Sequence, residues 1–108
     1  MIYEWRIYEV MPGKMNVLHN LFEKTILKLF KEYNIKVVGF WETIVGTSNI
    51  LYYMVAFEDV TKREKAWDAF YSDPEWLKAW KETSKIEGPL TERVVNMLLK
   101  PTSYSPMK

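Results

Sequence analysis

Cysteine is absent from this 108-residue chain, and histidine occurs once, at His19. Without cysteine, the chain can form no disulfide framework, no thiolate-bound zinc or iron–sulfur site and no cysteine nucleophile. A single histidine also makes a metal centre or a Ser-His-Asp arrangement hard to assemble. We therefore expect no metal and no cofactor.

The chain also lacks an excess of one charge and any long apolar run. Fifteen basic and fourteen acidic residues are interspersed and give a net charge of +1, so no basic stripe is available to follow the phosphates of a nucleic acid. No apolar run approaches the ~20 residues of a membrane span, and the first residues lack the basic and apolar segments of a signal peptide. These features predict a soluble cytoplasmic protein that does not bind nucleic acid.

Aromatic residues, in contrast, are abundant: five Trp, seven Tyr and five Phe make up 16% of the chain. This is more than a small core normally holds, which indicates that some of them line a cavity or a subunit interface. The length suits one domain, which we place at residues 1–100, followed by a C-terminal tail at 101–108.

The first predicted strand, residues 2–10, has two different faces. Side chains alternate across a strand, so Glu4, Arg6 and Tyr8 share one face while the other face is apolar. A polar face of this kind suits either a solvent edge or the wall of a polar cleft.

The remaining elements follow from periodicity and from turn residues. We predict a long amphipathic helix, two strands joined by a turn at Gly46, two consecutive helices and a last strand, at residues 14–33, 36–45, 50–57, about 60–72, 74–87 and 91–100. The third helix is expected to begin after Asp73, with Pro74 in its first turn. For the helix before it, either Asp59 or Thr61 can serve as the cap.

This order predicts an α+β fold of the ferredoxin-like βαββααβ type, with a four-stranded antiparallel sheet and helices on one face. The uncovered face must then retain large apolar side chains, which usually mark an interface. We expect a homodimer in which two such faces close a dimeric α/β barrel.

Several short motifs, taken in order, resemble the NIPSNAP family over nearly the whole chain. They are Tyr3-Glu4-x-Arg6-x-Tyr8, Pro12-Gly13-Lys14, Val38-Gly39-Phe40-Trp41, Asp73-Pro74-Glu75-Trp76, and Leu99-Lys100-Pro101-Thr102 with Ser105-Pro106. The resemblance implies similarity to dimeric α/β-barrel proteins, a group that includes cofactor-independent monooxygenases, isomerases and haem-binding members. It also implies a pocket at Glu4, Arg6 and Tyr8. The third strand has Tyr53, Met54 and Val55 where relatives often carry His or Trp, which argues against a haem-type or histidine-based role.

Glu4 and Arg6 lie two residues apart and therefore on one strand face. The guanidinium could bind a carboxylate or enolate, or the two residues could form a structural ion pair. Tyr8 could donate a hydrogen bond to a ligand or to a backbone carbonyl. We also place Trp41 and Tyr53 in the pocket wall, a choice that depends on strand register.

Two functions remain open at this point, and the sequence does not decide whether the protein is an enzyme. The first is binding of a small, partly apolar or acidic ligand in the barrel. The alternative is a cofactor-independent monooxygenase or isomerase acting on an aromatic or enolisable substrate, with Glu4 or His19 as the base and Arg6 stabilising the anion. His19 is otherwise a helix-surface residue.

Overall fold

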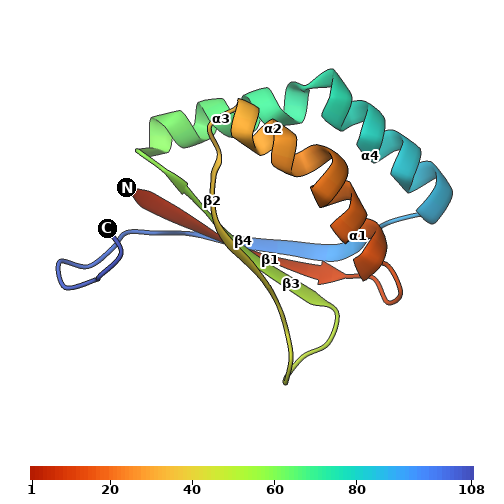
Figure 1. Cartoon of the computed structure of the whole chain (residues 1–108), viewed down its shortest axis with the longest axis horizontal. Helices are drawn as coiled ribbons and strands as arrows, with labels where there is room; N and C mark the ends of the chain where they lie inside the picture. The colour runs from red at the N-terminus through yellow and green to blue at the C-terminus, as the bar shows by residue number, and fades with distance from the viewer.

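The computed structural model describes all residues, 1–108, as a curved four-stranded antiparallel sheet with the helices packed on one face (Figure 1). Its elements are β1 (Ile2–Val10), α1 (Met15–Leu21), the π-helical turn η1 (Phe22–Ile26), α2 (Leu27–Glu32), β2 (Lys36–Glu42), β3 (Ile50–Phe57), α3 (Val60–Ser72), α4 (Pro74–Glu87) and β4 (Thr91–Leu99). The strand order is β2-β3-β1-β4. The predicted βαββααβ arrangement is confirmed. None of the helices is both long enough and apolar enough to cross a membrane.

Local sequence explains where α3 and α4 begin and end. The Asp59 carboxylate accepts a hydrogen bond from the backbone N–H of Lys62 at 2.8 Å, so Asp59 is the cap and Thr61 lies inside the helix. Asp73 caps α4 in the same way, with Pro74 at the first helical position. Gly88, at φ 75°, ends α4.

Two predicted elements need correction. The long helix runs from Met15 to Glu32 but is interrupted by η1, a π-helical turn that periodicity did not predict. β2 ends at Glu42 rather than at Val45, and Ile44 and Val45 project into solvent at the tip of the β2–β3 loop. These two apolar residues satisfied the β pattern, but they face nothing that would pair with them.

The register of β3 decides which aromatic residues face the helices. Tyr53 lies opposite Arg6 on β1 and opposite Phe40 on β2. An irregularity between Val37 and Gly39 shifts the β2 register, as a β-bulge does. Phe40 therefore points toward the helices with Tyr53, and Trp41 points to the opposite face.

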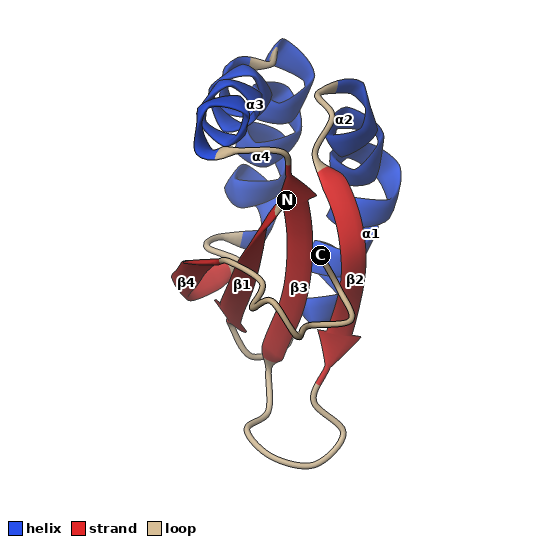
Figure 2. Ribbon diagram, turned by 90° about the vertical axis from the view of Figure 1, so that its left-hand side faces the viewer, coloured by secondary structure: helices blue, strands red, loops and turns tan.

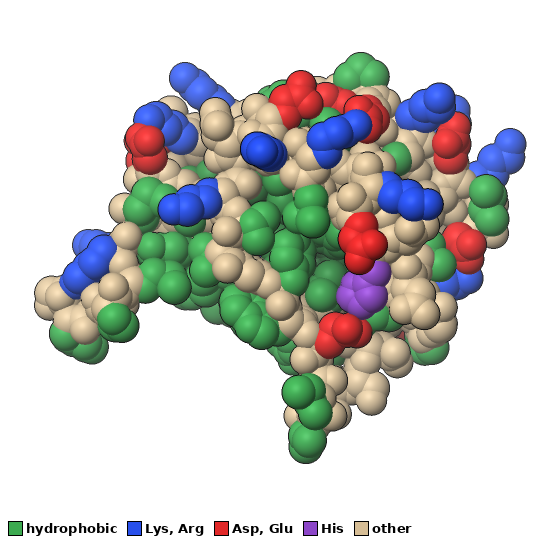
Figure 3. Space-filling model, viewed as in Figure 1, with side chains coloured by type: hydrophobic (Ala, Val, Ile, Leu, Met, Phe, Trp, Pro, Cys, Tyr) green, Lys and Arg blue, Asp and Glu red, His purple; other side chains and the backbone are tan.

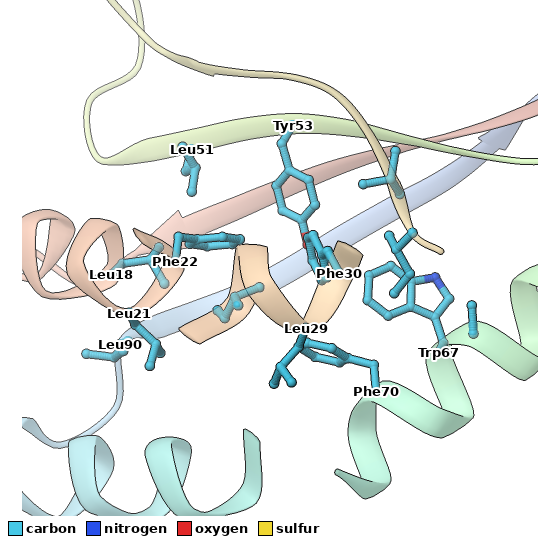
Figure 4. Close-up of a cluster of buried hydrophobic side chains, with 14 of the residues drawn as sticks. Leu18, Leu21, Phe22, Leu29, Phe30, Leu51, Tyr53, Trp67, Phe70 and Leu90 are labelled. Atoms are coloured by element: carbon cyan, nitrogen blue, oxygen red, sulfur yellow. The ribbon is translucent and has the colours of Figure 1, made fainter. Parts of the chain in front are cut away.

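The hydrophobic core lies between the sheet and the helices on its one covered face. Figure 2 shows these helices above and behind the strands. Phe30 of α2 is 1% exposed and packs with its ring against four aromatic side chains from η1, β3 and α3. These are Phe22, Tyr53, Trp67 and Phe70, and Figure 4 shows them converging on Phe30. The aromatic surplus is thus partly explained by the core itself.

The face of the sheet that the helices leave uncovered retains large apolar side chains, as predicted. The Trp5 ring lies 5.7 Å from the ring of Trp41 and 5.7 Å from that of Tyr52. Met97 of β4 pairs with Trp5 and is 43% exposed. In Figure 3, hydrophobic side chains gather in the hollow between the C-terminal tail and the β2–β3 loop. We call this surface the open face.

Candidate functional site

Glu4 is the centre of a buried polar cluster on the helix-facing side of β1. It is 0% exposed, and its two carboxylate oxygens accept five hydrogen bonds. Arg63 donates two of them, from Nε at 2.7 Å and Nη2 at 3.3 Å. Arg6 Nη1 donates at 2.7 Å, Trp67 Nε1 at 2.9 Å and Asn96 Nδ2 at 3.0 Å. The carboxylate is therefore saturated by donors from α3, β1 and β4.

This environment fixes the ionisation of Glu4. Burial alone would raise the pKa of the carboxyl, but the hydrogen bonds from Arg63, Trp67, Asn96 and Arg6 outweigh burial and lower the pKa to about 2. A general base near neutral pH requires a much higher pKa. Glu4 thus acts as the counter-ion of the cluster, which supports the structural ion pair rather than the base.

Arg6 is the second charged member of the cluster and is 7% exposed. Its Nε donates to the Tyr53 hydroxyl at 2.7 Å, and its Nη1 donates to the Glu4 carboxylate. The third nitrogen, Nη2, makes only long contacts, 3.3 Å to the hydroxyl of Tyr71 and 3.5 Å to that of Tyr8. The guanidinium is held firmly on one side and weakly on the other.

Aromatic groups surround Arg6 and keep it charged. The guanidinium carbon lies 4.6 Å from the ring centroid of Trp67, within the range of a cation–π interaction. Burial lowers the pKa of Arg6, but the neighbouring phenols Tyr53, Tyr8 and Tyr71 outweigh it and move the pKa above its ordinary value. Burial in turn raises the pKa of Tyr53 and of Tyr71. These two phenols are therefore neutral hydroxyls at physiological pH.

A cavity of about 370 Å³ adjoins this cluster, between the sheet and the helices. Its lining is Arg6, Tyr8, Leu18, Leu21, Ile26, Phe30, Tyr53, Trp67, Phe70, Tyr71, Trp76, Trp80, Thr91 and Val94. Arg6 is the one charged residue among them, and most of the others are apolar or aromatic. We call this space the sheet–helix cavity.

The π-helical turn η1 borders the same cavity. Ile26 contributes to the lining, and the Phe22 ring packs edge-on against Tyr53, with centroids 5.6 Å apart. Turns of this type insert an extra residue into a helix and occur often at functional sites. The irregularity thus lies beside the polar cluster.

The structure brings four of the five predicted pocket residues together: Glu4, Arg6, Tyr8 and Tyr53 form one hydrogen-bonded cluster. Glu4 belongs to it without lining the cavity. Trp41 was wrong as a partner of Tyr53, because the β2 irregularity places it on the open face. Phe40 occupies that position and stacks on Tyr53 with centroids 4.9 Å apart.

Sequence reasoning missed three residues of the site, Arg63, Trp67 and Tyr71. They follow one another at four-residue intervals on α3 and therefore share one helix face. That spacing was a usable signal, because it places an arginine on the same face as two aromatic residues. What it could not show is that this face meets Glu4 and Arg6.

His19, the other candidate base, lies away from the cavity. Its Nε2 is 3.3 Å from Oε2 of Glu42, and it borders a separate pocket with Phe40 and Trp41. Neither residue that sequence offered as a base therefore lines the sheet–helix cavity.

The βαββααβ topology and the apolar open face define an α+β protein of the dimeric α/β-barrel class. Within that class, the chain belongs to the NIPSNAP family, whose model matches residues 3–106. The predicted family and fold are confirmed.

The chain is similar to several known proteins in sequence or in fold. The chain is 24% identical over 107 residues to Protein NipSnap homolog 1 of Danio rerio, covering 99% of this chain and 36% of the relative, so it spans about a third of that protein. A crystal structure of a NIPSNAP family protein with unknown function from Agrobacterium tumefaciens is 26% identical, with a TM-score of 0.86, covering 100% of this chain and 94% of the other. A candidate antibiotic biosynthesis monooxygenase of Nitrosomonas europaea shares the fold at 11% identity, with a TM-score of 0.62 and coverage of 94% and 98%.

Proposed function

We propose that this protein binds a small organic anion with an apolar body in the sheet–helix cavity. The observation that supports this most is the position and the incomplete hydrogen bonding of Arg6. It is the one charged residue of a lining that is apolar or aromatic apart from Thr91, and its Nη2 makes only two long contacts. A guanidinium presented in this way suits the oxygens of an anion.

Charge balance supports the same conclusion. Glu4 is already paired with Arg63 through two hydrogen bonds, so the cluster of one carboxylate and two guanidinium groups retains a positive charge on the cavity side. Arg63 also contacts Glu64, but that carboxylate is exposed and lies outside the cavity. A bound monoanion would complete the balance where Arg6 meets the cavity.

The test is binding of small carboxylates to wild type and to Arg6→Met, measured by calorimetry and by thermal shift. Aromatic and aliphatic monocarboxylates of six to twelve carbons are suitable probes, each compared with its neutral amide. We expect wild type to bind the acids in preference to the amides. Arg6→Met should lose roughly 10- to 100-fold in affinity, the usual value of a hydrogen bond to a charged group.

Arg63→Met is the matched control, since it removes an arginine from the same carboxylate but does not line the cavity. It should weaken folding while leaving carboxylate affinity within a few-fold of wild type. Equal binding of acids and amides by wild type would contradict the proposal, as would equal losses in the two variants.

We also propose that the protein is a homodimer joined through the open face. The clustered rings of Trp5, Trp41 and Tyr52, continued by Met97, form an apolar surface that the chain itself does not cover. The Trp41 ring covers Gly39 on this face. A Cβ at Gly39 would lie 2.7 Å from the nearest atom of that ring, which is too close for any side chain. Two such faces packed together would bury the exposed rings, as expected for a homodimer interface.

The dimer is tested by light scattering after size-exclusion chromatography, where wild type should give twice the chain mass of 12.9 kDa. Met97→Lys places a charge on the open face and should yield a folded monomer at micromolar concentration. Leu98→Lys is its control, because Leu98 is 42% exposed on the same strand but points to the other face. A wild-type mass of one chain would rule the proposal out.

A further inference from the structure

We infer that the ligand of the sheet–helix cavity is an aromatic monocarboxylate whose oxygens accept hydrogen bonds from the hydroxyls of Tyr8 and Tyr71 and lie beside the charge of Arg6. This inference rests on the proposed function and specifies its ligand. It follows from counting the donors and acceptors around Arg6, beginning with Tyr53.

A tyrosine hydroxyl has one proton to donate and two lone pairs that can accept. Tyr53 is 0% exposed, and its oxygen has two neighbours, Arg6 Nε at 2.7 Å and the Tyr8 hydroxyl at 2.9 Å. Arginine can only donate, so the Tyr53 oxygen accepts from Arg6. The distance between the Tyr53 and Tyr8 oxygens allows either to donate, but donation by Tyr8 would leave the proton of the fully buried Tyr53 without an acceptor, so we assign Tyr53 as the donor.

Tyr8 is consequently an acceptor on both of its lone pairs. It accepts a hydrogen bond from the Tyr53 hydroxyl and, at 3.5 Å, one from Arg6 Nη2. Its own proton has no acceptor in the chain, and Tyr8 lines the cavity. The Tyr8 hydroxyl therefore offers a donor to the cavity.

Tyr71 reaches the same position from α3. Its oxygen accepts from Arg6 Nη2 at 3.3 Å, which leaves its proton without an acceptor in the chain. Two phenol protons therefore meet at one wall of the cavity, beside Arg6 Nη2, whose two N–H groups point at the same two phenol oxygens. A group that only accepts hydrogen bonds satisfies both phenol protons and lies beside the positive charge of Arg6, whereas an amide or an amine would bring further donors to a place that already has two.

The other residues that line the cavity indicate which class of anion fits it. Arg6 is the one positive charge in the lining, which suits a monoanionic carboxylate better than a dianionic phosphate. Beyond Tyr71 lie Trp76 and Trp80, with their ring centroids 5.3 Å apart. Trp80 is 37% exposed and Tyr71 is 45% exposed, so these rings stand at the mouth. Flat aromatic walls favour a flat aromatic body, and about 370 Å³ suits one or two fused rings.

The experiment measures the affinity of 1-naphthoate, 1-naphthamide and 1-naphthyl phosphate for wild type, Tyr8→Phe and Tyr71→Phe. We expect the carboxylate to bind best to wild type, and each Phe variant to lose about 5- to 10-fold for the carboxylate, as for one hydrogen bond. The weaker binding of the amide should change less than twofold. Tyr104→Phe is the control, because Tyr104 is exposed on the C-terminal tail and should change nothing.

Each outcome bears on a different claim. Tyr71 is half-exposed, so Tyr71→Phe should fold normally. If this variant binds the carboxylate as tightly as wild type, the assignment of Tyr71 as a donor is wrong, but the anion site at Arg6 is not affected. Tighter binding of the phosphate overturns the monocarboxylate class. If wild type binds none of the three probes and none of the carboxylates named above, the proposed function fails together with this inference.

Discussion

Replacing Glu4 with Gln is expected to lower the free energy of unfolding by about 3–5 kcal/mol, the usual cost of removing one partner from a buried ion pair. Gln retains the shape of the side chain but carries an NH2 group where the structure has an oxygen that accepts at least two hydrogen bonds. The substitution also leaves the guanidinium groups of Arg6 and Arg63 without their shared counter-ion. Urea denaturation at pH 7 would measure the loss.

Glu64→Gln supplies the matched control. Glu64 also pairs with Arg63, but it is exposed, and exposed pairs contribute 0–1 kcal/mol. If both substitutions cost the same, Glu4 would not be the centre of the cluster.

The same residue predicts how stability depends on pH. The pKa of Glu4 is about 2 in the folded protein against an ordinary value of 4.5, so the unfolded state binds the proton first as the solution is acidified. The contribution of Glu4 is therefore complete above about pH 4.5 and is lost as pH falls toward 2. A shift of this size corresponds to roughly 3 kcal/mol.

Denaturation curves collected from pH 6 down to pH 2 can test this dependence. The difference in stability between wild type and Glu4→Gln should shrink across that interval. A difference that stays constant with pH would show that the carboxylate is not ionised in the cluster.

Phe30→Ala should cost about 3–5 kcal/mol, the usual loss for a buried Phe replaced by Ala. Phe30 contacts aromatic rings from η1, β3 and α3, and no other aromatic ring of the core cluster contacts rings from all three elements. The neighbouring rings can close only part of the space, because Tyr53 and Trp67 are also held by the hydrogen bonds of the polar cluster. Thermal or urea unfolding would measure the effect.

Leu27→Ala, one turn earlier on α2, is the control for the loss of apolar volume. Leu27 is 37% exposed, so its truncation should cost less than about 2 kcal/mol. A small effect at Phe30, similar to that at Leu27, would mean that the core closes around the vacated volume.

From the sequence, Glu4 and Arg6 could form either a structural ion pair or a ligand site. The polar cluster has features of both. Glu4 is saturated and belongs to the stability of the fold, since it ties β1 to α3 and β4. Arg6 also lines the cavity; its Nε and Nη1 are held by Tyr53 and Glu4, while its Nη2 makes only long contacts. One guanidinium thus belongs to the buried ion pair and also to the lining of the cavity.

The sequence by itself determined the features that depend on local chemistry. β1 and β3 have the predicted bounds, because alternation and turn residues define them within one segment. Asp73 caps α4 and Gly88 ends it, because caps depend on the few residues around a helix end. The shared face of Glu4, Arg6 and Tyr8 followed from the period of a strand alone.

Only the tertiary structure decided which segments meet at that face. The irregularity in β2 selected Phe40 instead of Trp41, because one shifted residue reverses every side chain that follows. The packing of α3 across β1 brought Arg63 and Trp67 to Glu4 and Tyr71 to Arg6, over sequence separations of 59 to 65 residues. Contacts of that range depend on how whole elements pack, which no local pattern specifies.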